Sequence, residues 1–406
     1  MPMSPTRKLC CRAYQAALRA ALPVLPYRMP KILGSAQEVA PVLAERHVSS
    51  VLLVTGPSIN RLGLTQGLRD SLVAAGIACA VYDKTVANPT TTNVEEAAEL
   101  YRTNGCQAII GFGGGSPIDC AKAAGARIAA PGKSLGRMRG VMRVHRPLPL
   151  LLAVPTTAGS GSEATLAAVI TDEKTRFKYP INDFALIPSY AVLDASLTVG
   201  LPPAVTAQTG MDALTHAVEA YVGRSTTTFT RARATEAVCL IHESLLDAYR
   251  DGGDLAARRN MLTASHKAGL AFTRSYVGYV HGIAHSLSGQ YDTPHGLANA
   301  VILPHVLRAY GTAAGGKLAE LSRAAGIAGG STSDANAASA FIAWIDETNA
   351  ALGIPSHLGF IRDKDIPVMA ARADAESNPL YPVPVLWDAA DLERIYRVVQ
   401  GPSATN

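Results

Sequence analysis

Short apolar runs alternate with segments of helical period along residues 50 to 195. Apolar residues follow one another without polar alternation at 50–55, 78–82, 108–110 and 150–154, which predicts buried strands. Between these runs, apolar residues recur every three or four positions, which predicts helices at 62–75, at 93–104 and from Pro117 onward. Non-alternating strands separated by helices indicate a parallel sheet that is covered on both faces.

The pattern changes after residue 197. Leu201-Pro202-Pro203 marks a boundary, and beyond it Ala/Leu-rich segments predict helices at 204–223, 230–249, 254–272, 300–310, 316–326, 334–352 and 389–399. A Pro-rich stretch, 376–388, predicts a loop before the last of them. We therefore expect an N-terminal extension (1–29), an α/β domain with a parallel sheet (30–197) and an all-α domain (198–406).

Composition narrows the class of protein. The chain has 406 residues, of which 48% are hydrophobic and 17% charged, as in a compact folded enzyme with two cores. The net charge is +5, but no Lys/Arg block with interleaved aromatic residues is present, so we expect no nucleic-acid partner. No run of about 18 apolar residues occurs, which predicts no membrane span. The six cysteines form no CxxC pair, which favours reduced thiols in a cytoplasmic protein.

The N-terminal segment is free of acidic residues. No Asp or Glu occurs before Glu38, while several Arg and Lys residues do, a composition shared with transit peptides. The apolar piece from Ala16 to Leu25 is interrupted by Arg19 and Pro23, which argues against an export signal. We expect a helix on the protein surface here.

A glycine-rich loop, Gly111-Phe-Gly-Gly-Gly-Ser116, ends the third predicted strand. Glycines allow a close backbone approach to a pyrophosphate, and a helix N-terminus offers free N–H groups and a positive dipole. The loop departs from GxGxxG, because Ser116 stands in place of the last glycine. A second loop with small hydroxyl residues, Pro155 to Glu163, follows the next strand at the same carboxyl edge. Together the two loops predict a dinucleotide site and not only a structural turn.

A second group of residues has the chemistry of a metal site. Asp212 and His216 are spaced i, i+4 in a strong helical pattern, so both side chains project from one face. His281 and His285 share this spacing, and His295 follows in a Pro-His-Gly turn. One Asp with several His suits Fe²⁺ or Zn²⁺. The spacing leaves open which of the last three histidines are ligands. A catalytic metal needs an open position, so four protein ligands and one spare group would be sensible chemistry.

At these residues the chain resembles the iron-containing (group III) alcohol dehydrogenase family, from about Pro30 to Tyr396. The motifs that carry the resemblance are Gly113–Ser116, Pro155–Gly159, Val192–Asp194, Gly210–Tyr221, and His281–His285 with Pro294–Gly296. The resemblance implies a dinucleotide-binding α/β domain, an all-α metal-binding domain in a dehydroquinate synthase-like architecture, and an active site in the cleft between them.

The resemblance also implies residue roles. Fe²⁺ would be bound by Asp212, His216, His281 and His295, and Zn²⁺ or Ni²⁺ could occupy the same donors. His285 would lie near the nicotinamide and take part in proton movement. The cofactor would be held by Asn88, Gly113, Gly114, Gly115, Ser116, Asp119, Thr156, Thr157, Thr165, Lys178 and Leu197.

One position departs from the family pattern. The first strand of this family often ends in Val-Thr-Asp, and the Asp favours the free ribose 2′-OH of NAD, whereas this chain has Val54-Thr55-Gly56. Loss of that charge removes repulsion against a 2′-phosphate, which Ser58 or Arg61 could contact. We therefore hypothesise that the enzyme accepts NADP at least as well as NAD.

The predicted function is interconversion of a small alcohol and its aldehyde or ketone by hydride transfer to or from NAD(P). Three alternatives are a zinc-dependent glycerol dehydrogenase-like enzyme, a dehydroquinate synthase-like lyase and a non-enzymatic metal-binding or structural protein. We expect the substrate pocket to be lined by loop residues, and the candidates are Phe272, Tyr276, Tyr279, Asn299 and Tyr381. The resemblance further suggests a homo-oligomer, such as a dimer.

Overall fold

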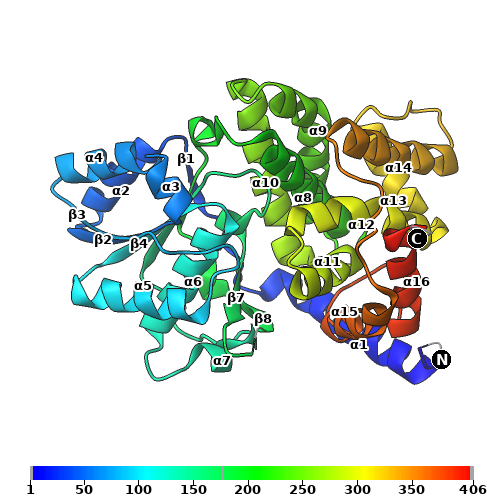
Figure 1. The fold of residues 1–406 in the computed structure, drawn as a ribbon, viewed down its shortest axis with the longest axis horizontal. Helices are drawn as coiled ribbons and strands as arrows, with labels where there is room; N and C mark the ends of the chain where they lie inside the picture. Colours follow the sequence, from blue (N-terminus) through cyan, green and yellow to red (C-terminus); the bar gives the residue numbers. More distant parts are fainter. Residues whose placement is uncertain (1–2, 176, 403–406) are drawn as a thin grey trace. The chain divides into compact units, whose positions relative to one another are not determined.

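The computed structural model describes residues 3–175 and 177–402. It divides into two compact units, one formed by residues 26–201 and the other by residues 1–25 together with 202–406 (Figure 1). The predicted boundary after residue 197 lies four residues before this division. Residues 3–25 pack with the helices that follow residue 201. No helix of the described residues is both long and apolar enough to cross a membrane.

A six-stranded parallel sheet forms the centre of the 26–201 unit. Its order is β1-β9-β6-β4-β2-β3, and every neighbouring pair is parallel, as predicted. The strands are β1 (Lys31–Leu33), β2 (Ser50–Val54), β3 (Ala78–Tyr82), β4 (Ala108–Gly113), β6 (Leu150–Pro155) and β9 (Tyr190–Val192). Successive side chains of β2 belong alternately to two separate apolar clusters, with Leu52 in one and Leu53 in the other. The runs lack polar alternation because both faces of the sheet are covered.

Helices cover this sheet (Figure 1). They are α2 (Val39–Glu45), α3 (Pro57–Arg61), α4 (Gln66–Ala74), α5 (Thr91–Thr103), α6 (Gly115–Ala129) and α7 (Leu135–Met138). Helix α5 begins at a capping box, in which Thr90 and Asn93 satisfy each other's backbone N–H groups. The helix predicted at 62–75 is present as α4 but begins four residues later, after a turn in which Gly63 has φ +68°; α3 was not predicted.

A small second sheet was not predicted. It has the order β5-β8-β7, with β5 (Gly140–Val141), β7 (Ala167–Asp172) and β8 (Phe177–Asn182). Strands β7 and β8 pair antiparallel, Ala167 opposite Asn182. Short 3-10 helices occupy Leu22–Val24, Ala36–Glu38, Ser162–Ala164, Phe184–Leu186, Ala195–Thr198 and Asp363–Asp365.

The other unit is built from helices among its described residues. They are α1 (Pro5–Ala21), α8 (Pro203–Val222), α9 (Thr228–Arg250), α10 (Leu255–Ser275), α11 (Tyr279–Tyr291), α12 (His295–Tyr310), α13 (Thr312–Ala324), α14 (Asp334–Ala351), α15 (Ile366–Ser377) and α16 (Ala389–Gln400). The all-α prediction is confirmed, although α11 and α15 were not predicted as helices. Helix α8 begins at Pro203, because a proline at the first helical turn loses no hydrogen bond.

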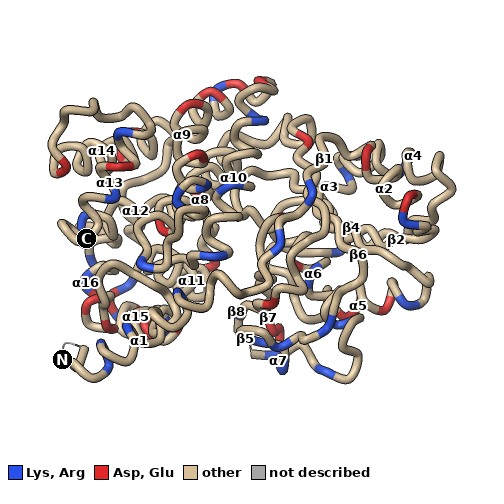
Figure 2. The backbone as a smooth tube through the Cα atoms, turned by 180° about the vertical axis from the view of Figure 1, so that it is seen from behind, with Lys and Arg blue, Asp and Glu red and all other residues tan. Residues whose placement is uncertain are grey.

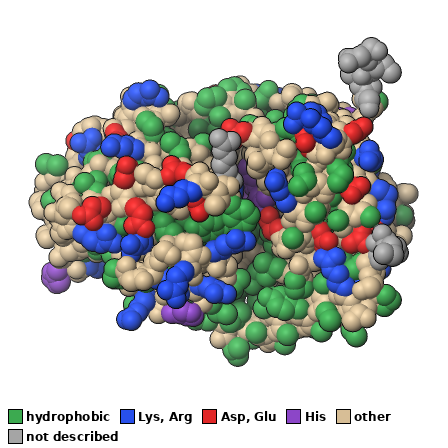
Figure 3. Space-filling model, turned by 60° about the horizontal axis from the view of Figure 1, so that its bottom comes forward, with side chains coloured by type: hydrophobic (Ala, Val, Ile, Leu, Met, Phe, Trp, Pro, Cys, Tyr) green, Lys and Arg blue, Asp and Glu red, His purple; other side chains and the backbone are tan. Residues whose placement is uncertain are grey.

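Charged side chains of both signs are interspersed on the face drawn in Figure 3. Basic residues gather around α7 and β5 (Figure 2). Four of them, Lys133, Arg137, Arg139 and Arg143, line one surface depression there. All six cysteines lie in the described part of the chain and are free thiols.

Candidate metal centre and dinucleotide loop

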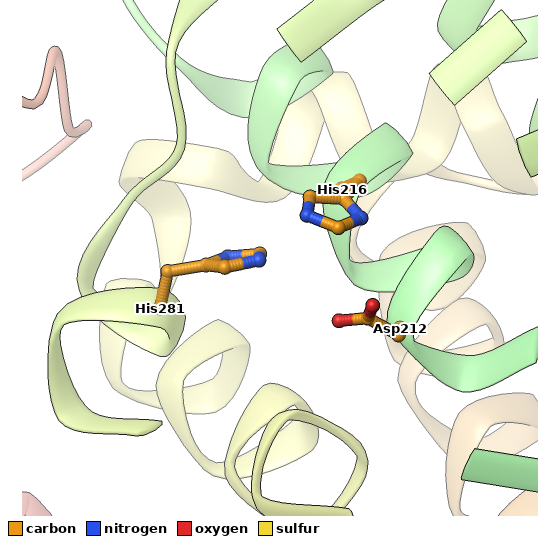
Figure 4. Close-up of side chains that lie close together, drawn as sticks. All are labelled: Asp212, His216 and His281. Carbon is orange, nitrogen blue, oxygen red and sulfur yellow. The ribbon is translucent and has the colours of Figure 1, made fainter. Parts of the chain in front are cut away.

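Helices α8 and α11 bring three predicted metal ligands together. Asp212 and His216 lie one turn apart on α8, and His281 lies near the start of α11. One ligand atom from each lies within 4.8 Å of the others, and all three side chains are buried. Figure 4 shows the side chains pointing toward one another from the two helices. The i, i+4 spacing is therefore confirmed as one face of a helix, and that face meets His281.

His295, the first residue of α12, lies beside this group. Its Nε2 atom is 3.5 Å from Oδ1 of Asp212. The buried Asn299, one turn further along α12, has its Nδ2 atom 2.7 Å from Asp212 Oδ1, 3.2 Å from His281 Nε2 and 3.1 Å from His295 Nε2. Three predicted ligand atoms thus lie around a single amide nitrogen, so their lone pairs converge on one small region.

A buried carboxylate lies behind His281. Glu219 of α8 accepts hydrogen bonds from the backbone N–H groups of Gly278 and Val280 at 2.8 Å each, and its Oε2 lies 2.6 Å from His281 Nδ1. Burial raises the pKa of Glu219 to about 7 and lowers the pKa of His281 to about 3. His281 is therefore neutral. We assign the ring proton to Nδ1, which then donates to Glu219, because Nε2 lies 3.2 Å from the Asn299 amide nitrogen and is needed as an acceptor there.

His285 has a carboxylate partner of its own. Its Nδ1 lies 2.5 Å from Oε1 of Glu376 on α15, and the Tyr381 hydroxyl donates to the same oxygen at 2.7 Å. The His285 ring stacks on the His295 ring, with 5.1 Å between ring centroids. Burial opposes ionisation of Glu376, but the charge and hydrogen bond of His285 and the bond from Tyr381 outweigh it and lower the pKa of Glu376.

The donor set fits a divalent first-row metal. One carboxylate oxygen and imidazole nitrogens are borderline ligands that suit Fe²⁺ or Zn²⁺, and the described ligand atoms include no thiolate. Phe272 stacks on His216 with ring centroids 4.1 Å apart, so an apolar wall adjoins the donors. Tyr279, which was expected to line the substrate pocket, is fully buried and stacks on Trp387.

The glycine loop lies where β4 passes into α6. Gly113 pairs with Pro155 of β6, so the two predicted loops leave neighbouring strands at the same carboxyl edge. Gly113 has φ +144°, and a Cβ atom there would lie 2.7 Å from Pro117. A Cβ on Gly115 would lie 3.0 Å from the Ser160 hydroxyl. The loops are in close contact, and α6 directs its N-terminal N–H groups to this edge.

Other predicted cofactor residues lie around the same helix end. The Asn88 backbone N–H donates to the Ser116 hydroxyl at 3.3 Å, and Lys178 Nζ donates to the Asn88 side chain at 2.7 Å. A Cβ atom on Gly56 would lie 4.0 Å from Pro117. The N-terminus of α6 therefore has a lysine, small hydroxyl groups and no acidic side chain in its first turn.

Two predicted cofactor residues, Asp119 and Leu197, make internal contacts in this structure. Asp119 accepts hydrogen bonds from the Ser162 hydroxyl at 2.7 Å and the Val169 N–H at 2.9 Å, and burial raises its pKa. Leu197 packs against the apolar cluster on one face of the sheet.

Thr165 binds a buried lysine. Its carbonyl and hydroxyl oxygens accept hydrogen bonds from Lys122 Nζ at 2.8 and 2.9 Å. Thr156 is buried, Thr157 faces Gly114, and Ser58 is exposed on α3. Cofactor contacts by these residues stay predictions.

Sequence reasoning missed the two carboxylates behind the histidines. Glu219 lies three residues after His216 and thus on the same face of α8, so helical spacing could have found it. Glu376 is 91 residues from His285 along the chain, and no local pattern joins them.

A buried Asp/His cluster and a glycine loop at a helix N-terminus define a class: enzymes that use a metal ion together with a bound dinucleotide. In such a pair the metal polarises an oxygen and the nicotinamide carries a hydride, which is dehydrogenase chemistry.

Sequence comparison gives the family. Residues 31–195 match the family "Iron-containing alcohol dehydrogenase", and residues 206–399 match "Fe-containing alcohol dehydrogenase family, C-terminal". The chain belongs to the iron-containing alcohol dehydrogenase family and is an oxidoreductase that acts on alcohols and aldehydes. The predicted family is confirmed.

Named relatives agree with this assignment. The chain is 41% identical over 338 residues to 1,3-propanediol dehydrogenase of Klebsiella pneumoniae, which covers 81% of this chain and 87% of the relative. It is 36% identical over 353 residues to the NAD-dependent methanol dehydrogenase of Bacillus methanolicus, covering 85% and 92%. The crystal structure of a 1,3-propanediol oxidoreductase superposes with a TM-score of 0.88 at 36% identity, covering 92% of this chain and 99% of that one.

Proposed function

We propose that Asp212, His216, His281 and His295 bind one Fe²⁺ and that His285 moves the proton of the alcohol hydroxyl. The observation that carries this division is the set of three ligand atoms within 4.8 Å of one another, with His295 3.5 Å from Asp212. That group of three does not include His285, whose ring stacks on the His295 ring and whose Nδ1 atom is bonded to the partly exposed Glu376. When bound, the iron supplies Lewis acidity toward an alcohol oxygen, and the nicotinamide accepts a hydride.

The protein's own residues prepare this chemistry. Glu219 fixes the tautomer of His281, so that a neutral nitrogen is available to the metal without a proton being lost first. Glu376 fixes Nδ1 of His285 in the same way and leaves Nε2 for proton exchange.

The cofactor in this proposal lies with its pyrophosphate at the N-terminus of α6. Free N–H groups of α6 and the nearby Lys178 favour negative charge there. Gly56 carries no acidic group against a ribose 2′-phosphate, so we propose that NADP is accepted at least as well as NAD. The methanol dehydrogenase relative is named as NAD-dependent, which makes this position a point of difference to test.

The proposed substrate class is a small primary alcohol or its aldehyde. The relatives support it, because they are named for methanol and 1,3-propanediol. The test is an anaerobic assay after Fe²⁺ reconstitution, with short alcohols and aldehydes combined with NAD(H) and NADP(H), followed by the absorbance of reduced nicotinamide. We expect turnover with at least one short substrate and a kcat/KM for NADP no lower than for NAD.

The cofactor part of the assay has a matched pair of variants. Gly56→Asp restores the acidic group, and Gly56→Ala controls for its Cβ atom, which would lie 3.2 Å from the Thr85 carbonyl oxygen. We expect Gly56→Asp alone to lower kcat/KM for NADP about 10-fold or more relative to NAD. A wild-type enzyme with a strong preference for NAD would refute the NADP proposal.

We further propose that the protein is a homodimer in the cytoplasm. The family resemblance supports self-association, and six free thiols suit a reducing compartment. Light scattering of the purified enzyme tests the first point: a mass near 42.4 kDa, that of one chain, would contradict it. Fractionation of the source cells tests the second.

A further inference from the structure

Helix α1 packs on the loop that follows α15, within the same compact unit (Figure 1, α1 in blue beside α15 in orange). Three of its side chains reach that region. Arg7 forms a bidentate pair with Asp374 at 2.6 and 3.0 Å, and Arg12 and Gln15 bond to the loop backbone. Gln15 is buried. Buried polar side chains need hydrogen-bond partners, and Gln15 finds its partners in this loop.

The loop from Asn378 to Trp387 needs such donors because of its prolines. Pro379, Pro382 and Pro384 have no N–H group, so the segment cannot pair its carbonyl groups in a regular ladder.

Two side chains of α1 supply the missing donors. Arg12 donates to the carbonyl oxygens of Val383 at 2.7 Å and Pro384 at 2.9 Å. Gln15 donates to those of Tyr381 at 2.7 Å and Pro379 at 3.2 Å. Arg12 also donates to Gln15 Oε1 at 2.8 Å, which joins the two side chains into one unit. Four carbonyl groups of the loop are thus satisfied from α1.

The loop in turn supports His285. The Tyr381 hydroxyl donates to Glu376 Oε1, and the same oxygen lies 2.5 Å from His285 Nδ1. Gln15 bonds the backbone of the same tyrosine. Tyr381 therefore links α1 to His285: its backbone carbonyl accepts from Gln15, and its hydroxyl, at the other end of the residue, donates to the Glu376 oxygen that is bonded to His285.

We propose that α1 is a positioning element of the active site: Arg12 and Gln15 fix the 378–387 loop so that Tyr381 and Glu376 hold His285 in its working orientation. The inference rests on the proposed role of His285 in proton movement. Helix α1 lies before residue 31, where the family match begins, so the family motifs do not include it. A misplaced general acid–base loses rate even when ligands and substrate still bind.

The test uses the full-length, iron-reconstituted enzyme. Arg12→Ala and Gln15→Leu remove the donors, Arg12→Lys restores one charged donor, and Tyr381→Phe breaks the next bond in the series. The matched control is Lys8→Gln, which removes a charge from an exposed position of the same helix. Bound iron is measured for every variant, so that a change in rate is not confused with loss of the metal.

Two readouts are taken. Hydrogen–deuterium exchange follows the amides of residues 378–387, among which Tyr381 N–H bonds Ser377 and Trp387 N–H bonds Tyr279. We expect exchange there to be about 10-fold faster in Arg12→Ala and Gln15→Leu, with α13 and α14 unchanged. Steady-state kinetics should show kcat lowered about 10-fold at unchanged iron content and nearly unchanged KM, with partial recovery in Arg12→Lys.

A double-mutant cycle tests whether the effect passes through Tyr381. If it does, Arg12→Ala combined with Tyr381→Phe lowers kcat by less than the product of the single effects. The inference is overturned if Arg12→Ala and Gln15→Leu match Lys8→Gln in exchange and kcat, or if the two single effects multiply. Should the wild type show no iron-dependent turnover, the proposed function fails, while the exchange data still decide whether α1 fixes the loop.

Discussion

Two histidines of α11 each have a carboxylate on Nδ1, but the two carboxylates differ in environment. Glu219 is fully buried and accepts two backbone N–H groups besides His281. Glu376 is only partly buried and shares its oxygen with the Tyr381 hydroxyl. The buried pair suits a fixed ligand, and the more exposed pair suits a group that exchanges protons with its surroundings.

This contrast predicts different outcomes for single variants. Asp212→Ala and His281→Ala should lose iron and activity together, because each removes a donor atom from the cluster. His285→Ala should keep its iron and lose kcat about 100-fold, within the usual contribution of general acid–base catalysis. Metal analysis and turnover of the same samples check this; equal loss of iron in all three variants would refute the assignment.

Glu219 offers a sharper test of orientation. Glu219→Gln keeps the size of the side chain but replaces a carboxylate oxygen, so its bond to His281 weakens. We expect iron affinity to fall by 10- to 100-fold, the usual effect of losing the partner of a metal-bound histidine. Competition against a chelator measures it, and Glu243→Gln, an exposed change on α9, is the control. Affinity equal to that of the control would rule out an orienting role.

The sequence predicts which side chains lie together on one helix, but it does not predict which side chains meet between two helices. Asp212 and His216 follow from helical spacing alone. Their approach to His281 requires α8 to pack near α11, a contact between residues more than 60 positions apart. Glu376 has no periodic signal because its partner lies on another helix.

Among the elements, long periodic helices and buried strands are predicted well. Strand β3 agrees at both ends with the predicted 78–82, and α14 ends one residue before the predicted 352. The short elements were missed: β1 has three residues and β5 two, too few to establish a period. Strands β7 and β8 were also missed, and in β8 the sequence carries Pro180, a residue that argues against a strand.

Helix α6 is attached to the segment before β7 by a buried cation. Lys122 is fully buried and donates to Thr165 O, Thr165 Oγ1 and Ala167 O. Burial lowers its pKa from 10.5 to about 8. Between pH 8 and 10.5 the unfolded lysine therefore holds more protons than the folded one, so this lysine makes the free energy of unfolding rise with pH.

The predicted outcome is a pH-dependent difference between two proteins. Below pH 8 both states of the wild type are protonated at Lys122, and its desolvation cost is constant. From pH 8 to 10.5 the free energy of unfolding of wild type, minus that of Lys122→Met, should increase by up to about 3 kcal/mol. Equilibrium urea unfolding under reducing conditions measures it. A difference that stays constant or decreases over this range would contradict the assigned direction.

In the whole molecule, the predicted cofactor residues and the predicted metal ligands lie in different compact units. The predicted cofactor residues all lie within residues 26–201, and the predicted metal ligands all lie within the helical unit. The sequence predicts this division because strand-like runs stop shortly before Leu201-Pro202-Pro203. It does not predict that residues 1–25 join the helical unit, because the partners of α1 lie some 365 residues later in the chain.

Turnover as a function of bound iron tests the proposed metal centre. The enzyme is stripped of metal, reconstituted anaerobically with increasing Fe²⁺, and assayed with a short alcohol and NAD(P) while bound iron is measured in each sample. We predict that turnover rises linearly with bound iron and saturates at one iron per chain, with Asp212→Ala neither binding iron nor turning over. Full activity in the stripped enzyme, or activity in Asp212→Ala equal to that of the wild type, would contradict a metal-dependent dehydrogenase built on this cluster.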